Sequence, residues 1–278
     1  MNNTNTNSTQ DVQLPAPYCR EAGEGPGVVC LHANAGTSSQ WRSLMDRLAP
    51  NFRVLAPDSF GVGGSPAWPA ERKPALGEEV SLLEPVFKRA GESFSLVGHS
   101  YGASIAMMAA LRRTGQVRAM AVYEPTLFAL LEHDVGGREA VKGIRAVAGD
   151  VAAFVSKGDH ASAARRFLDY WMGNGTWDAI PDARRAPIAA SMVNSGAWSK
   201  ALFMDQTPLS AFRALEIPIL YMTGAESPAS SLEVARVLTE AIPNVVRVVF
   251  PGLGHMGPVT HPEVVNNAVA EFLHRHGV

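Results

Sequence analysis

Residues 94–106 read FSLVGHSYGASIA, and they pass from a buried strand to a helix through a very short turn. The run FSLV is typical of a strand, and ASIA begins a segment with helical spacing. Between them, Gly98, Ser100 and Gly102 form the pattern G-x-S-x-G. In this context the pattern indicates a tight, strained turn, with glycines two residues to either side because a Cβ atom there would collide with neighbouring backbone. Ser100 is therefore a candidate nucleophile.

Similar apolar runs recur along the chain, separated by segments with helical spacing. The runs are nearly continuous rather than alternating, which is typical of parallel strands covered on both faces. The expected strands are residues 28–31, 53–56, 93–97, 117–123, 217–222 and 245–250. The expected helices are residues 38–48, 76–90, 100–113, 231–241 and 262–274. This alternation predicts an α/β fold with a mostly parallel, doubly wound sheet, whose strand carboxyl ends share one ligand-binding edge.

One long segment, residues 127–215, interrupts this alternation. It contains helix-like stretches but no convincing strand, and it is too long for a structureless loop in a compact domain. We therefore expect a helical cap over the ligand-binding edge. The core would then consist of residues 14–126 and 216–278, preceded by a disordered polar tail at residues 1–13.

Aromatic side chains are frequent in this insertion. Trp171, Trp177 and Trp198 lie within it, and Phe128 lies at its start. These rings either form the core of the cap or line a substrate pocket. As pocket residues we expect Phe128, Trp171 and Trp198.

The composition excludes several classes of protein. The 278 residues contain 24 Lys and Arg against 26 Asp and Glu, and no extended basic run, which argues against nucleic acid or an anionic membrane as the main partner. No stretch of ~18 apolar residues could span a bilayer, and the first residues lack the basic and apolar regions of a secretory signal. Cys19 and Cys30 form neither a disulfide framework nor a zinc site. We expect a cytoplasmic protein without a metal.

A serine hydroxyl is a weak nucleophile until a neighbouring base takes its proton. His255 is the candidate base, because it lies in the glycine-rich loop PGLGHMGP (residues 251–258) directly after the last expected strand. Such a loop lets the imidazole reach back over the sheet edge. By contrast, we expect His99 to be structural, His261 to start a helix and His32 to form hydrogen bonds at a strand end.

The serine turn, the late histidine and their order in the chain resemble the α/β-hydrolase fold family, over essentially residues 14–277. Two further segments carry the resemblance. LHANAG (residues 31–36) resembles the oxyanion segment HGxxG of the family, and DSFGVGGS (residues 58–65) resembles its loop D-x-x-G-x-G-x-S.

The resemblance implies an oxyanion hole formed by the backbone N–H groups of Asn34 and Tyr101. The sequence departs from the family at Ala33, where a glycine is usual. A methyl group at this position is tolerated only if the backbone φ is negative.

The resemblance also implies an acid that orients the histidine. Loss of this acid lowers the reaction rate by a factor on the order of 10⁴. Many members carry it in a G-x-x-D pattern after the next-to-last strand, but here Ser227 stands in place of Asp. We favour Glu124, because some members carry the acid after that earlier strand and Pro125 fixes the chain just beyond it. Glu226 and a site without an acid are the alternatives. Asp58 is expected to be structural.

Together these features predict a cofactor-independent serine hydrolase that acts through an acyl-enzyme. An ester of a small to medium hydrophobic substrate is the first expectation. A hydrolase of a carbon–carbon bond in a ring-cleavage product is the alternative, and cofactor-free haloperoxidase-type activity also occurs in the family. A non-catalytic ligand-binding protein is the alternative from another class, since function resides in the site rather than in the fold. A homodimer is expected only on base rates.

Overall fold

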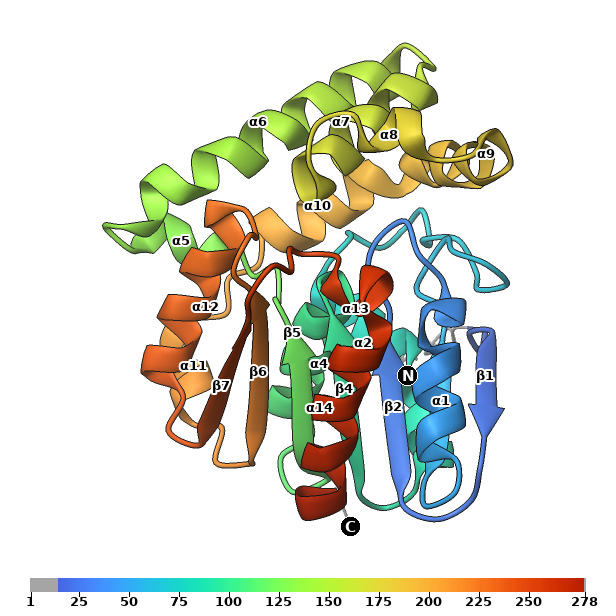
Figure 1. The fold of residues 1–278 in the computed structure, drawn as a ribbon, viewed down its shortest axis with the longest axis vertical. Coiled ribbons are helices and arrows are strands. Elements are labelled where there is room, and N and C mark those ends of the chain that lie inside the picture. The colour runs from blue at the N-terminus through green and yellow to red at the C-terminus, as the bar shows by residue number, and fades with distance from the viewer. Residues whose placement is uncertain (1–14, 278) are drawn as a thin grey trace, which may run out of the picture.

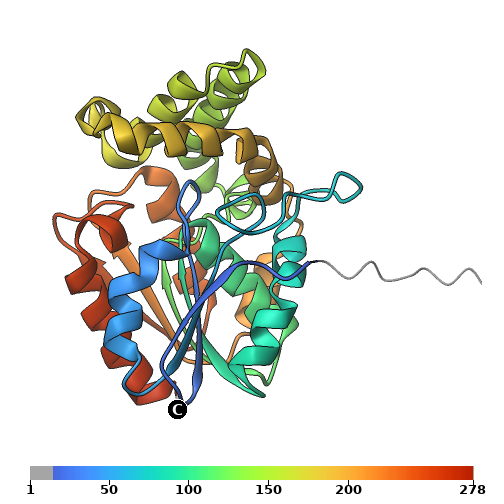
Figure 2. The same cartoon turned by 90° about the vertical axis from the view of Figure 1, so that its right-hand side faces the viewer.

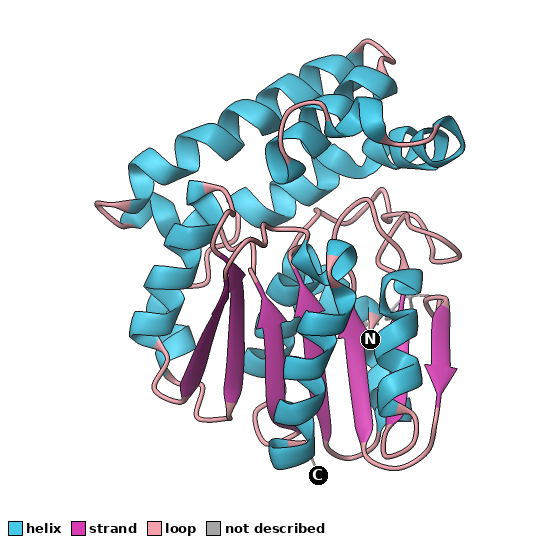
Figure 3. Cartoon of the chain, in the orientation of Figure 1, coloured by secondary structure: helices cyan, strands magenta, loops and turns pink. Residues whose placement is uncertain are grey.

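The computed structural model describes residues 15–277, so the predicted polar tail lies outside the described residues. These residues form a seven-stranded sheet in the order β1-β3-β2-β4-β5-β6-β7 (Figures 1 and 3). β1 is antiparallel to β3, and the other neighbours are parallel. The strands are β1 (Cys19–Ala22), β2 (Gly27–Leu31), β3 (Arg53–Pro57), β4 (Phe94–His99), β5 (Val117–Tyr123), β6 (Ile219–Gly224) and β7 (Val245–Phe250).

The predicted α/β sheet is confirmed, and the side chains of β2 show why its strands read as continuous apolar runs. Val29 and Leu31 pack into the hydrophobic cluster on one face, while Val28 and Cys30 pack into the cluster on the other. Because both faces are covered by helices, every side chain of such a strand is buried.

Sequence analysis missed β1. Its sequence, CREA, contains no apolar run and lies at the edge of the sheet. The strand exists because it pairs with β3, from Cys19 opposite Pro57 to Ala22 opposite Val54. A short polar strand of this kind is specified by its partner rather than by its own residues.

Helices cover both faces of the sheet. In front of it in Figure 1 lie α1 (Arg42–Leu48), which follows the short 3-10 turn η1 (Ser38–Trp41), and α14 (Pro262–His276). The other face packs against α2 (Leu76–Leu82), α3 (Glu84–Ala90), α4 (Tyr101–Arg112) and α12 (Ala229–Ala241). Residues 76–90 were expected as one helix, but the chain breaks at Leu83. Pro85 lies in the first turn of α3, where its missing N–H costs least.

Helices without an intervening strand connect β5 to β6. They are α5 (Ala129–His133), α6 (Gly137–Ser156), α7 (His160–Met172), α8 (Thr176–Ala179), α9 (Asp182–Ser191), η2 (Met192–Asn194), α10 (Ser195–Phe203) and α11 (Leu209–Arg213). Helices α6 to α10, which we call the cap helices, lie across the carboxyl edge of the sheet (Figures 1 and 2). Along α6, the buried residues Val141, Ile144, Val147 and Val151 recur at helical spacing and face the rest of the protein. Within the described residues, no helix combines the length and hydropathy needed to cross a membrane.

A substitution at Gly102 tests how closely α4 approaches the end of β2. A Cβ atom there would lie 2.2 Å from the carbonyl oxygen of Leu31 and 2.5 Å from that of His32. We expect Gly102→Ala to lower the free energy of unfolding by about 2 kcal/mol or more, because rigid backbone must move. Denaturation in urea measures it.

The control is Gly149→Ala in the middle of α6, where nothing lies within 4 Å of the added atom. This variant should gain about 0.5–1 kcal/mol, because alanine favours the helix over glycine. Equal effects of the two substitutions would contradict the close approach of α4 to β2.

Candidate active site

Backbone strain concentrates at the carboxyl edge of the sheet. In the described part of the chain, the non-glycine residues with positive φ are Ala35 (57°), Ser100 (57°) and Glu124 (48°). Ala35 lies in the loop after β2, Ser100 after β4 and Glu124 after β5, which are adjacent strands. Left-handed conformations are costly for residues with a Cβ atom, and such strain clusters at functional sites. The backbone therefore marks this edge as a candidate site.

Ser100 occupies the predicted turn between β4 and α4. Its N–H donates to the carbonyl oxygen of Tyr123 at 2.9 Å, and its side chain is buried. A Cβ atom at Gly98 would lie 2.5 Å from the Cα atom of Ala103, and Gly102 is equally confined. The expected reason for the two glycines is thus confirmed.

The structure brings Ser100, His255 and Glu124 into one chain of contacts. Nε2 of His255 lies 2.9 Å from Oγ of Ser100, and Nδ1 lies 2.6 Å from Oε2 of Glu124. Both His255 and Glu124 are buried, at 1% and 0% exposure. A carboxylate on Nδ1 fixes the tautomer that leaves Nε2 free to accept the serine proton.

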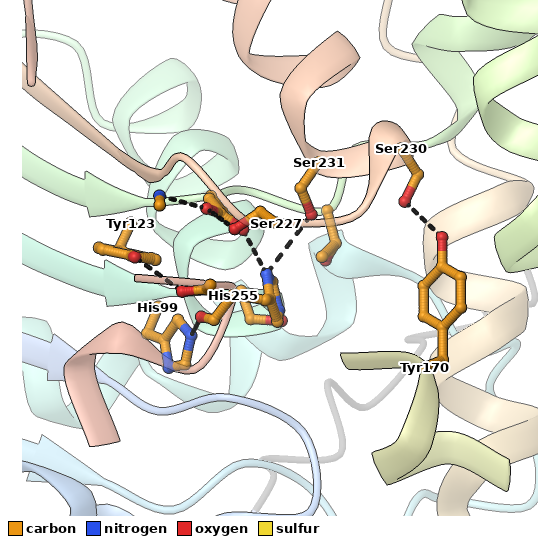
Figure 4. A network of polar contacts seen from close by, with 12 residues as sticks. His99, Tyr123, Tyr170, Ser227, Ser230, Ser231 and His255 are labelled. Atoms are coloured by element: carbon orange, nitrogen blue, oxygen red, sulfur yellow. Dashed lines mark hydrogen bonds and ion pairs between the residues drawn. The ribbon is translucent and has the colours of Figure 1, made fainter. Parts of the chain in front are cut away.

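The second carboxylate oxygen of Glu124 is held from β6 and the loop after it. Oε1 accepts hydrogen bonds from the N–H of Gly224 at 2.7 Å and from the hydroxyl of Ser227 at 2.5 Å. Figure 4 shows this network around Ser227 and His255. Glu226 is exposed, and its N–H donates to the carbonyl oxygen of Leu253. Ser227, which stands where Asp was expected, therefore donates a hydrogen bond to the carboxylate of Glu124.

The loop that carries His255 is held by two neighbouring side chains. His99 donates from Nε2 to the carbonyl oxygen of His255 at 2.8 Å, while its Nδ1 accepts from Gln40 at 3.1 Å. The hydroxyl of Tyr123 donates to the carbonyl oxygen of Gly254 at 2.8 Å (Figure 4). Burial holds the pKa of His99 well below its usual range, so this imidazole stays neutral and keeps its bonding pattern.

Two cavities meet at Ser100. The larger, about 740 Å³, opens between η1, α7, α9 and the His255 loop. The smaller, about 40 Å³, lies under α6 and α10. Asn34, Phe167 and Trp171 line both. The charged side chains that line the larger cavity are Arg42 and Arg184. Ser100, His255 and the buried carboxylate of Glu124 thus lie beside one ligand-sized cavity and one much smaller one, an arrangement typical of a candidate active site.

A family model for the alpha/beta hydrolase fold matches residues 26–262. The chain belongs to this family. The solved enol-lactonase from Burkholderia xenovorans LB400 has a similar fold, with a TM-score of 0.70 and 20% identity, over 92% of this chain and 95% of that chain.

Curated relatives of this α/β-hydrolase are hydrolases of several kinds. The (E)-2-((N-methylformamido)methylene)succinate hydrolase of Acinetobacter baylyi is 24% identical, over 91% of this chain and 92% of its own. A pimeloyl-[acyl-carrier protein] methyl ester esterase of Aliivibrio fischeri is 23% identical, over 93% and 98%. A 2-hydroxy-6-oxo-6-(2'-aminophenyl)hexa-2,4-dienoic acid hydrolase of Metapseudomonas resinovorans is 24% identical, over 92% and 86%.

Residues 31–36 of this α/β-hydrolase accommodate their departure from the family pattern. Ala33 is not among the residues with positive φ, so its methyl group is tolerated, and its N–H donates to Oε1 of Gln40 at 3.1 Å. In this segment, Ala35 is the residue that has a left-handed backbone conformation. Asn34 lines both cavities beside Ser100. Tyr101 is the first residue of α4, where an N–H has no intrahelical acceptor.

The three aromatic residues expected in a pocket are all buried near the serine. Trp171 stacks on the imidazole of His255 with ring centroids 4.0 Å apart, and it lines both cavities. Phe128 and Trp198 line the smaller cavity. Trp177 lies within the cap, where the guanidinium group of Arg185 approaches its ring.

Buried polar groups fix the loops around the site. Nδ1 of His32 donates to the carbonyl oxygen of Ala33 at 2.8 Å, and its Nε2 accepts from the N–H of Ser59 at 3.1 Å. The carboxylate of Asp58 accepts from the N–H groups of Ser38 at 2.6 Å and Gly64 at 3.3 Å. Their positions agree with the structural roles expected for His32 and Asp58.

Sequence analysis missed two residues that hold the site together, Gln40 and Glu79. Gln40 contacts both the N–H of Ala33 and the imidazole of His99. Glu79 of α2 accepts from the hydroxyl of Tyr101 and from the N–H of Phe60, each at 3.2 Å. Both residues lie within predicted helices, and no local pattern distinguishes them from surface positions. Only their contacts in the folded chain could have identified them.

Burial raises the pKa of the Glu79 carboxyl to about 7, despite the hydrogen bonds that it accepts. Because the folded state holds this proton more tightly than the unfolded state, stability falls as pH rises from the unfolded pKa near 4.5 towards 7. We expect Glu79→Gln to remove this loss. The difference in unfolding free energy between pH 5 and pH 8 should be smaller in the variant than in the wild type.

Urea denaturation at the two pH values measures this difference. The exposed Glu226→Gln is the matched control and should leave the pH dependence unchanged. An identical pH dependence for Glu79→Gln and the wild type would contradict a buried carboxyl that titrates near neutrality.

Proposed function

We propose that this protein is a serine hydrolase that cleaves carboxylic esters through an acyl-enzyme. One observation carries the proposal, namely the continuous chain of contacts from Ser100 to His255 to Glu124 at 2.9 and 2.6 Å. The left-handed Ser100 on its tight turn, at the junction of two cavities, supports it.

In the first half-reaction, Oγ of Ser100 attacks the ester carbonyl carbon while Nε2 of His255 takes the serine proton. Glu124 stabilises the imidazolium that forms. The carbonyl oxygen becomes an oxyanion, and the N–H groups of Asn34 and Tyr101 stabilise its charge. The tetrahedral intermediate then collapses, the bond to the alcohol breaks, and His255 donates its proton to the departing oxygen.

The second half-reaction returns the enzyme to its starting state. A water molecule gives a proton to Nε2 of His255 and attacks the acyl carbon, so that a second oxyanion forms in the same place. The bond to Ser100 breaks, and the serine oxygen recovers the proton from the imidazolium. The acid product then leaves. Every proton passes through His255, so this scheme depends on Glu124 in both halves.

A substrate that is mainly hydrophobic fits the apolar and aromatic walls, among them Phe167, Leu168 and Ile180. An ester hydrolase among the curated relatives agrees with the reaction class. The relative named as a hydrolase of a hexadienoic acid supports a second candidate, hydrolysis of a carbon–carbon bond in a ring-cleavage product. The cap helices are proposed to cover the bound substrate in either case.

A fluorophosphonate probe tests the activated serine without knowledge of the substrate. Intact mass spectrometry should show one adduct on the folded wild type and none on Ser100→Ala, because only an activated hydroxyl reacts quickly. A folded wild type without an adduct would contradict the proposal. Repeated turnover of 4-nitrophenyl acetate would in addition exclude a ligand-binding protein that is acylated once and stops.

The choice of acid has its own test. We expect Glu124→Gln to lower kcat for a reactive ester by about 10³–10⁴, because the amide no longer holds the required tautomer of His255. The exposed Glu226→Gln is the matched control and should retain kcat within about twofold of the wild type. Near-native turnover of Glu124→Gln, combined with a loss in Glu226→Gln, would show that the other carboxylate acts.

A further inference from the structure

The two cavities at Ser100 differ in size and in their relation to His255. The larger cavity, about 740 Å³, is lined by His255 and by Met256 and Pro258 of the same loop. The smaller cavity, about 40 Å³, touches Ser100 and Asn34 but not His255. Ser100 therefore borders a wide space that His255 also lines and a narrow one that His255 does not line.

The mechanism decides which part of an ester enters each space. The imidazole must donate its proton to the departing oxygen, so the leaving group has to lie within reach of Nε2 of His255. That places the leaving group in the larger cavity. The acyl group, which stays attached to Ser100, then points away from the imidazole and into the smaller cavity.

Most walls of the smaller cavity belong to the packed interior of the cap helices, and Phe128 adds to them from the start of the connection between β5 and β6. Val147 and Val151 of α6 and Trp198 of α10 are each at most 3% exposed, and Phe128 is 1% exposed. Packed interiors resist expansion, because moving one side chain displaces its neighbours. A volume of about 40 Å³ is roughly three times what one water molecule needs, which is enough for a few heavy atoms.

We propose that this protein is selective for esters that join a short acyl group, of about two to four carbon atoms, to a bulky leaving group. The proposal rests on the serine hydrolase function proposed above and adds the substrate class. The narrow cavity limits the acid part, whereas the wide cavity accepts a large alcohol. The reverse arrangement, a long-chain acyl ester of a small alcohol, does not fit.

Two ester series test this assignment. In the first, 4-nitrophenyl esters vary the acyl group from acetyl to octanoyl. In the second, acetate esters carry leaving groups of increasing size, from phenyl to naphthyl. We expect kcat/KM to fall about tenfold or more from butanoyl to hexanoyl, because extra methylene groups overpack the narrow cavity. The bulky acetates should stay within about threefold of phenyl acetate, because their leaving groups enter a cavity of ordinary ligand size.

A pair of cap variants locates the effect. Val151→Ala widens the smaller cavity and should raise kcat/KM for the hexanoyl ester relative to the acetyl ester by about fivefold or more, by relieving the overpacking. Ala148→Leu narrows the same cavity and should restrict the enzyme to the acetyl ester. Ile188→Ala, in the larger cavity, is the matched control and should alter the preference for leaving groups without changing the preferred acyl length.

The outcomes separate this inference from the function on which it rests. Hydrolysis of every ester regardless of acyl length, or a preference for octanoyl, would overturn the inference and leave the serine hydrolase intact. Hydrolysis of no ester in either series would overturn both. A shift of acyl preference in Ile188→Ala but not in Val151→Ala would reverse the assignment of the two cavities and so refute the proposal.

Discussion

The buried carboxylate of Glu124 is the group on which the rest of the site depends. It is fully buried, and a charge removed from water is tolerated only when partners replace its hydration. Three donors do so, from His255, Gly224 and Ser227. They come from the β7 loop, the end of β6 and the loop after β6, so satisfying one carboxylate ties three segments to the end of β5. The same contacts orient the imidazole towards the serine.

Strain and close packing occur together at this edge. Ser100 and Glu124 take left-handed conformations that their Cβ atoms disfavour, and each costs of order 1–3 kcal/mol. The surroundings hold them there: the N–H of Ser100 is bonded to β5, and the N–H of Glu124 donates to the carbonyl oxygen of Met222 on β6 at 3.1 Å. The rigid sheet therefore stabilises turns that would not persist in an isolated peptide. As a result, Ser100 and Glu124, the proposed nucleophile and acid, have fixed positions.

Trp171 of the cap helix α7 contacts His255 directly. Its indole ring stacks on the imidazole of His255 and at the same time forms part of the wall of both cavities. It also packs against the rings of Phe128, Phe167 and Tyr170. Since α7 carries this side chain, any displacement of α7 would alter the environment of the His255 imidazole as well as the shape of both cavities.

The amino-acid sequence alone determined the features whose cause is local. The alternation of apolar runs and helical segments predicts the sheet, because each run must be buried on both faces, and GHSYG specifies the serine turn, because its glycines and its neighbouring strand and helix are contiguous. Only the tertiary structure decided how distant residues combine. His255 lies 155 residues from Ser100 and 131 from Glu124, and the strand order brings them within hydrogen-bond distance.

The two candidate carboxylates show most clearly what the sequence determines and what the tertiary structure decides. The sequence offered Glu124 and Glu226, each after a strand, and favoured Glu124 because of Pro125 and the family resemblance, but no local feature shows which carboxylate reaches the histidine. In the folded chain, Ser227 donates to Glu124 while Glu226 is exposed. The edge strand β1, the contacts of Gln40, the buried Glu79 and the unequal cavities likewise arise from packing between segments far apart in the sequence. No single stretch of residues encodes them, because each depends on the partner that the fold places opposite it.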